Sequence, residues 1–283
     1  MKKQILIPTD YSSNAFNAIV YAFKLFKDQE CEFHIFHSYF LARSSNNNLL
    51  FPEPGPADYE VVEEKSDSKM ELLKEQVSAL ESNPNHIIHY DHKFGTLIEL
   101  LRQKILLENI DLICMGTRGD TNDREVAYGR NSVNVMESVR DCAILAVPAR
   151  VVFGGLNEIV FPTNFKSQYN DMEMQTFVNI ARAGNSAIRV LHIGKESDLT
   201  EKQQTNRKQL EAYFKDIEFS YHWLENVGVQ EGLLTFVDQR NSGMISFINR
   251  KHWFFGSVFS NPLVKNLGIH SKVPLLALHD SRN

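Results

Sequence analysis

The chain has few of the features that mark several common protein classes. Its 283 residues include three cysteines, Cys31, Cys114 and Cys142. The odd number and the absence of C-x-x-C spacing argue against a disulfide framework or a zinc ribbon, and they favour a reducing compartment. No apolar run approaches the roughly 20 residues that span a bilayer, and residues 5–7 are too short for a signal peptide's apolar core. We therefore expect a cytoplasmic protein that does not enter the membrane.

Basic charge is not in excess either. The sequence has 30 Lys and Arg against 35 Asp and Glu, which gives a formal net charge of -5. This balance argues against nucleic acid or an anionic membrane surface as the partner. Hydrophobic residues make up 43% of the chain, an ordinary share for a globular protein. The length exceeds that of a typical single domain, so we expect two domains.

The first half alternates strand-like and helix-like patterns. Five short apolar runs have the length of buried strands: residues 4–8, 32–37, 87–94, 112–115 and 143–147. Most stretches between them have the 3.6-residue periodicity of helices, and Ser12 or Ser13 is suited to cap the first helix. A long Pro- and Asn-containing loop covers residues 39–57. The alternation predicts βαβ units that form a parallel sheet with helices on both faces.

The second half repeats this order. Residues 158–164 (EIVFPTN) echo residues 4–10 (QILIPTD), and residues 189–192 echo residues 34–37. The repeat predicts a duplication at domain scale, with a first domain over residues 1–150 and a second over residues 151–283.

A glycine-containing loop follows the fourth strand. Gly116, Gly119 and Gly129 have the spacing G-x2-G-x9-G in a segment that runs strand, loop, helix. Glycines let the backbone approach an anion closely, and the next helix offers free N–H groups at its N-terminus. The spacing alone is also compatible with ordinary loop glycines. The position at the carboxyl end of a central strand favours a phosphate site.

Taken together, these segments resemble the universal stress protein family. The resemblance rests on residues 5–12 (ILIPTDYS), 35–37 (IFH) and 111–116 (DLICMG), and on the glycine spacing. It covers nearly the whole chain when the second repeat is counted. It implies α/β architecture with two tandem open five-stranded parallel sheets of order 3-2-1-4-5, each with helices on both faces. It also implies binding of ATP, with Mg²⁺, where the glycine loop is kept.

The resemblance further implies which residues contact ATP. On the adenine and ribose side they are Pro8, Thr9, Asp10 and Ser38, and beneath the ribose and phosphates they are Met115 and Gly116. On the phosphate side the resemblance implies Gly119 and Gly129. The charges of Arg118 and Arg130 also suit phosphate oxygens, and Asn131 and Ser132 complete the expected site. The family has Ser or Thr directly after the third glycine, where this chain has Arg130. The arginine either compensates with charge or fills the phosphate site.

The second repeat departs from this pattern. Asn164 replaces Asp10, and the glycine positions hold Ile248, Lys251 and Asn261. We therefore expect that residues 151–283 do not bind ATP in the family's manner. The basic and aromatic residues 250–255 form either a partner or anion site or, as we favour, a core-filling loop in place of the nucleotide.

Three histidines lie close together at one predicted strand. His86, His89 and His92 alternate faces of a strand and cannot converge on one ion, so no metal site is expected. His37 and His192 occupy matching strand ends. They are either site residues or, as we favour, half-buried histidines bonded to backbone. Cys114 is expected to be a buried small hydrophobe.

No catalytic constellation is found in the sequence. A Walker-type lysine is absent from the loop, and no carboxylate near it is identified as a general base. The leading hypothesis is a stress-response protein, not an enzyme, in which ATP is a regulatory ligand that controls binding of an unidentified protein partner. The alternatives are a scaffold of the same fold without nucleotide and an enzyme that adenylates a substrate. A homodimer of the whole chain is also possible.

Overall fold

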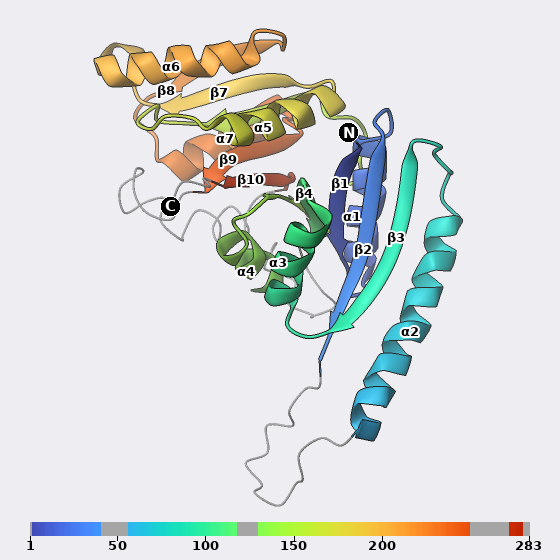
Figure 1. Ribbon diagram of the computed structural model, residues 1–283. Coiled ribbons are helices and arrows are strands. Elements are labelled where there is room, and N and C mark those ends of the chain that lie inside the picture. Colours follow the sequence, from blue (N-terminus) through green and yellow to red (C-terminus); the bar gives the residue numbers. More distant parts are fainter. Residues whose placement is uncertain (1, 41–55, 118–129, 250–271, 280–283) are drawn as a thin grey trace, which may run out of the picture.

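The computed structural model describes residues 2–40, 56–117, 130–249 and 272–279 (Figure 1). The elements of the first half are β1 (Lys3–Pro8), α1 (Ser13–Leu25), β2 (Cys31–Tyr39), α2 (Pro56–Ser78), β3 (His86–Phe94), α3 (Leu97–Glu108), β4 (Leu112–Gly116), α4 (Arg130–Ser138) and β5 (Ala143–Val147). Those of the second half are β6 (Glu158–Pro162), α5 (Asp171–Ala183), β7 (Ala187–Ile193), the short 3-10 helix η1 (Glu196–Asp198), α6 (Glu201–Phe214), β8 (Phe219–Leu224), α7 (Val229–Arg240), β9 (Met244–Asn249) and β10 (Leu275–His279).

The strands form one sheet of order β3-β2-β1-β4-β5-β10-β9-β6-β7-β8. Within each half the described pairs are parallel, and the order 3-2-1-4-5 is confirmed in both halves. The halves join through β5 and β10, which pair antiparallel with Leu145 opposite Leu276. The expectation of two separate sheets did not include this seam. The division into domains at residue 150 remains a prediction, because the sheet is continuous across it.

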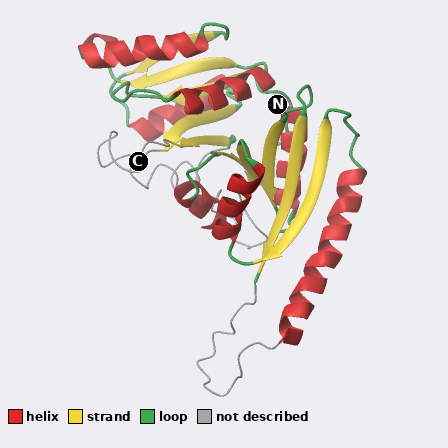
Figure 2. Ribbon diagram, viewed as in Figure 1, coloured by secondary structure: helices red, strands yellow, loops and turns green. Residues whose placement is uncertain are grey.

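Helices cover both faces of the sheet (Figure 2). On one face α1, α2, α5 and α6 pack over a single buried cluster that runs through both halves. On the other face α3, α4 and α7 contribute to a second cluster. Successive side chains of β1 and β2 point to opposite faces, so these strands contribute to both clusters. Ile5 and Ile7 belong to the first cluster, and Leu6 and Phe36 to the second.

Local sequence signals set the helix ends. Ser12 is the N-cap of α1, where its Oγ accepts a hydrogen bond from the Ala15 N–H at 3.2 Å, as expected from the sequence. The two matching helices α3 and α7 both end at an asparagine in the left-handed conformation, Asn109 and Asn241. Asparagine tolerates that conformation better than most residues. Among the described residues, no helix combines the length and apolarity needed to cross a bilayer.

Candidate functional site

A tight turn follows β1 at the carboxyl edge of the sheet. The Asp10 Oδ1 accepts hydrogen bonds from the Ser12 backbone N–H and hydroxyl, at 3.1 and 2.5 Å. The Thr9 Oγ1 accepts one from the Tyr11 N–H at 3.0 Å, and Tyr11 has a positive φ of 65°. These bonds hold the Asp10 carboxylate in place at the start of α1, while the residue itself stays exposed.

His37 fixes the other side of this turn. Its Nδ1–H donates to the Thr9 carbonyl at 2.6 Å, and the ring lies 4.3 Å from the Tyr11 ring. Burial lowers the pKa of His37, although the bond to Thr9 opposes the shift. The prediction of a half-buried histidine bonded to backbone is confirmed, and the neutral imidazole is a structural part of the turn.

The end of β4 lies beside this turn, because β1 and β4 are parallel neighbours. After Gly116 comes Thr117, whose carbonyl accepts a hydrogen bond from the Ser132 hydroxyl at 2.8 Å. This bond holds the first turn of α4 against the end of β4. The Thr117 side chain is buried, and its Oγ1 has no hydrogen-bond partner among the described residues. Polar groups therefore gather where an open α/β sheet binds its ligands.

Gly116 has a packing role that the sequence did not reveal. A Cβ at this position would lie 2.8 Å from the carbonyl oxygen of Asn14, which is closer than real contacts allow. The glycine therefore lets α1 approach β4 closely. A larger residue at position 116 disturbs the fold as well as any ligand, so it cannot isolate a binding role.

The remaining expected ligand residues fall into two groups. Pro8 ends β1, Ser38 lies in β2, Met115 is buried in β4 and Asn131 is exposed in α4. Arg118, Gly119 and Gly129 lie outside the described residues, and so does the side chain of Arg130, the first residue of α4. The contacts of all these residues with ATP stay predictions.

The second half keeps the turn but not its chemistry. The His192 Nδ1–H donates to the Thr163 carbonyl at 2.8 Å, and the Asn164 Oδ1 accepts from the Lys166 N–H at 3.0 Å. An amide thus stands where the first half has a carboxylate. Asn249, at the end of β9, donates through its side chain to the Met136 carbonyl and accepts at its own carbonyl from Arg140. Contacts with the first half therefore occupy this strand end.

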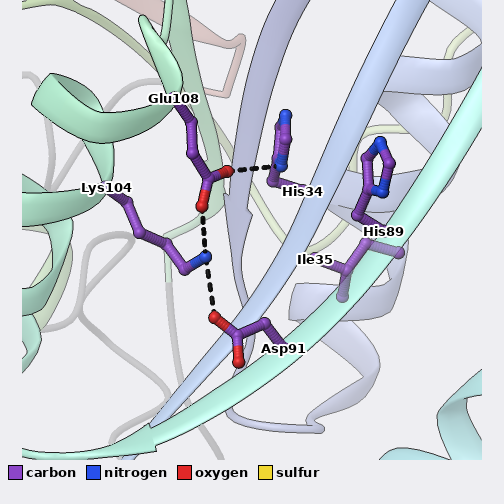
Figure 3. Close-up of a pocket in the computed structure, with 6 residues that line it drawn as sticks. All are labelled: His34, Ile35, His89, Asp91, Lys104 and Glu108. Carbon is purple, nitrogen blue, oxygen red and sulfur yellow. Dashed lines mark hydrogen bonds and ion pairs between the residues drawn. The ribbon is translucent and has the colours of Figure 1, made fainter.

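A second polar region lies near the amino end of β2, on the face covered by α3 (Figure 3). It is a pocket of about 240 Å³ lined by His34, Ile35, His89, Asp91, Lys104 and Glu108. The Lys104 ammonium donates to the Asp91 and Glu108 carboxylates at 2.7 and 2.8 Å. The second Glu108 oxygen lies 2.5 Å from the His34 Nδ1. Burial lowers the pKa of His34, and Glu108 opposes that shift.

The histidines of β3 divide between two faces as expected. The His86 Nε2 lies 3.1 Å from the Phe26 carbonyl, and the His92 Nε2 lies 2.9 Å from an Asp67 oxygen of α2. His89 instead stacks on His34, with ring centroids 4.9 Å apart. Alternation within one strand could not reveal this partner on β2. The available signal was the alternating pair Glu32 and His34, which places both side chains on one face.

An open sheet of order 3-2-1-4-5 in each half, with polar groups at the carboxyl ends of its central strands, defines the doubly wound α/β class. Within that class, the family model described as "Universal stress protein family" matches residues 1–148. The chain therefore belongs to the universal stress protein family. No curated protein matches it.

Solved structures share the fold of the whole chain. A universal stress protein from Archaeoglobus fulgidus DSM 4304 is 16% identical with a TM-score of 0.72, and the match covers 98% of both chains. A putative universal stress protein from Pseudomonas aeruginosa UCBPP-PA14 is 9% identical with a TM-score of 0.58, over 98% of this chain and 93% of that one. The cytoplasmic domain of a prokaryotic cation chloride cotransporter has a TM-score of 0.53 at 8% identity, over 100% of this chain and 98% of that one. The same fold thus occurs in different settings, so function must be argued from the site.

Proposed function

We propose that this universal stress protein binds ATP, with Mg²⁺, in its first half as a regulatory ligand. The observation that carries the proposal is the meeting of three features at one sheet edge. These are the Asp10 turn after β1, the end of β4 at Gly116 and Thr117, and the start of α4 held there by Ser132. The N-terminus of a helix next to a fixed carboxylate suits a nucleotide, whose phosphates need donors and whose ribose needs an acceptor.

The features of the second half argue that each chain binds one nucleotide, in the first half. Asn164 replaces the carboxylate there, and the end of β9 is held by hydrogen bonds to residues 136 and 140. We propose that this half is a structural partner of the first. In this view nucleotide occupancy sets the conformation of residues 117–130 and so controls the binding of an unidentified protein partner, without catalysis.

The test is calorimetric titration of ATP with Mg²⁺ into the whole chain and into Asp10→Asn. Asn164 shows that an amide supports the same turn, since it accepts the equivalent backbone hydrogen bond. The substitution therefore removes the charge while keeping the local structure. We expect one site per chain in the native protein, and about tenfold weaker binding in Asp10→Asn through loss of a charged acceptor worth about 1.5 kcal/mol.

The matched control is Asn164→Ala, at the same position of the second half, which should leave ATP affinity unchanged. Equal loss in Asp10→Asn and Asn164→Ala would contradict the assignment of the site to the first half. No binding at protein concentrations of about 100 μM, with no nucleotide carried through purification, would favour the scaffold function instead.

A further inference from the structure

Three potential metal ligands meet on the α3 face of β2 and β3, away from the carboxyl edge of the sheet. Glu32 and His34 point to this face from alternate positions of β2, and His89 of β3 is the register partner of His34. The ligand atoms of these three residues all lie within 4.8 Å of one another. The His89 Nε2 is 3.2 Å from a Glu32 oxygen, so these two ligands already face each other.

The His34 ring is held with one nitrogen turned toward this group. A Glu108 oxygen lies 2.5 Å from Nδ1, and Nε2 also has an oxygen partner, which a metal ion bound at Nε2 would displace. The Gln4 Oε1 lies 2.7 Å from Nε2, and Gln4 is the register partner of Glu32 on β1. Nε2 thus faces the Glu32 side. A carboxylate that orients a histidine for a metal is a recurring arrangement in metal sites.

The equivalent place in the second half contains the protein's own cations. Glu158 takes the place of Gln4 and Arg189 that of His34, as the repeat offsets require. Arg240 takes the place of Glu108, since each is the last residue of its helix before a left-handed asparagine. Both guanidinium groups donate to the Glu158 carboxylate at 2.8–2.9 Å. Among the described residues of the first half no guanidinium lies here, and imidazoles and carboxylates take this place instead.

Local charge also favours a cation. The carboxylates of Glu32, Asp91 and Glu108 outnumber the two ammonium groups nearby. Lys104 is already shared between Asp91 and Glu108, and Lys2 lies 3.7 Å from Glu32 at the rim. Figure 3 shows Lys104 and Asp91 on the side of His34 away from His89.

We propose that Glu32, His34 and His89 bind a divalent transition-metal ion of the zinc class, with Glu108 as the residue that positions His34. Imidazole and carboxylate ligands suit Zn²⁺, and three protein ligands leave one position for water. The ion links β2 to the edge strand β3 and stabilises that edge by binding only the folded form. The site does not depend on the proposed nucleotide function, because it uses none of the residues at the carboxyl edge.

The test is calorimetric titration of Zn²⁺ into the metal-free whole chain without nucleotide, alongside His89→Ala, Glu32→Gln and the control His92→Ala. His92 lies on the same strand but faces α2, where it pairs with Asp67. We expect one Zn²⁺ per chain in the native protein and in His92→Ala. In His89→Ala and Glu32→Gln, Zn²⁺ binding should be lost or weakened more than about 100-fold. That exceeds the loss caused by changing a residue that contacts only a metal ligand.

Glu108→Gln tests the positioning role separately. We expect Zn²⁺ binding about 10- to 100-fold weaker and a changed visible absorption spectrum of the Co²⁺-substituted site, which a purely structural role would leave unaltered. His89 is about half exposed, so its alanine variant should fold, and Glu32→Gln keeps the shape of the side chain. The absence of Zn²⁺ binding up to about 100 μM, or equal binding in the native chain and in both ligand variants, would overturn the proposal.

Discussion

At the scale of single residues, Glu158 shows how a buried charge is stabilised in this fold. Its carboxylate accepts hydrogen bonds from Arg189, Arg240 and the Ser242 hydroxyl. Burial raises the pKa of Glu158, but these donors outweigh burial and hold the pKa at about 2, below the ordinary value of 4.5. The charged form is therefore favoured in the native state. Its contribution to stability is present above about pH 4.5 and is lost as the pH falls toward 2.

This network predicts the behaviour of Glu158→Gln. The variant leaves two guanidinium groups without their shared partner, so the free energy of unfolding at pH 7 should fall by about 3 kcal/mol. The decline of stability between about pH 4.5 and 2 should also become shallower. Urea unfolding over a pH series measures both effects.

The control for that series is Glu218→Gln. Glu218 accepts from the same Arg189 at 2.9 Å, but its side chain is 74% exposed. Exposed pairs contribute little, so its change should stay within about 0.5 kcal/mol. If both variants lost the same stability, the Glu158 network would have no special role.

At the scale of elements, α2 is an amphipathic helix with one narrow buried stripe. Ser66, Met70, Leu73 and Val77 recur at helical spacing and are buried, and the Tyr11 hydroxyl contacts Ser66 from the turn after β1. The charged residues between them are mostly exposed. The helix thus covers β2 and β3 along one line of apolar contacts.

Adjacent leucines of α2 give a matched test of this stripe. Leu73 is 3% exposed and Leu72 is 60% exposed. We expect Leu73→Ala to lower the free energy of unfolding by about 2–4 kcal/mol, because it removes buried methyl groups and leaves a cavity. Leu72→Ala should change it by less than about 0.5 kcal/mol. Denaturant unfolding of both variants measures these changes. Similar losses of stability in the two variants would contradict the packing of α2 through the face that contains Leu73.

At the scale of the whole molecule, the seam between β5 and β10 joins the halves. Every described residue of both strands is buried, and the pairing runs from Ala146 opposite Leu275 to Ile144 opposite Ala277. Each half thereby covers the edge strand of the other. Unpaired apolar edge strands associate readily, so this seam is central to the stability of the tandem chain.

The seam predicts the behaviour of residues 1–150 expressed alone. With β10 removed, the exposed β5 edge should pair with a second copy, so the fragment should form a concentration-dependent dimer or aggregate. Light scattering during size-exclusion chromatography at two concentrations measures this, with the full chain as the comparison. A folded fragment that stays monomeric at both concentrations would show that the seam is not needed.

Much of the fold could be predicted because its signals are local. Apolar runs such as residues 5–7 and 112–115 marked buried strands, and Ser12 marked the start of α1. The echo of residues 4–10 in residues 158–164 predicted the duplication, and the strand order of both halves followed from the family resemblance. The face assignment of His86, His89 and His92 also held, since it depends only on the two-residue period of a strand.

The sequence by itself determined the α/β class, the tandem repeat and the loss of the Asp10 carboxylate in the second half. Tertiary structure alone decided three other features: the antiparallel seam, the close approach of α1 to Gly116, and the meeting of His34 with His89. The physical reason is that side-chain periodicity specifies a face within one element, whereas strand register and edge pairing are set by contacts between residues distant in sequence.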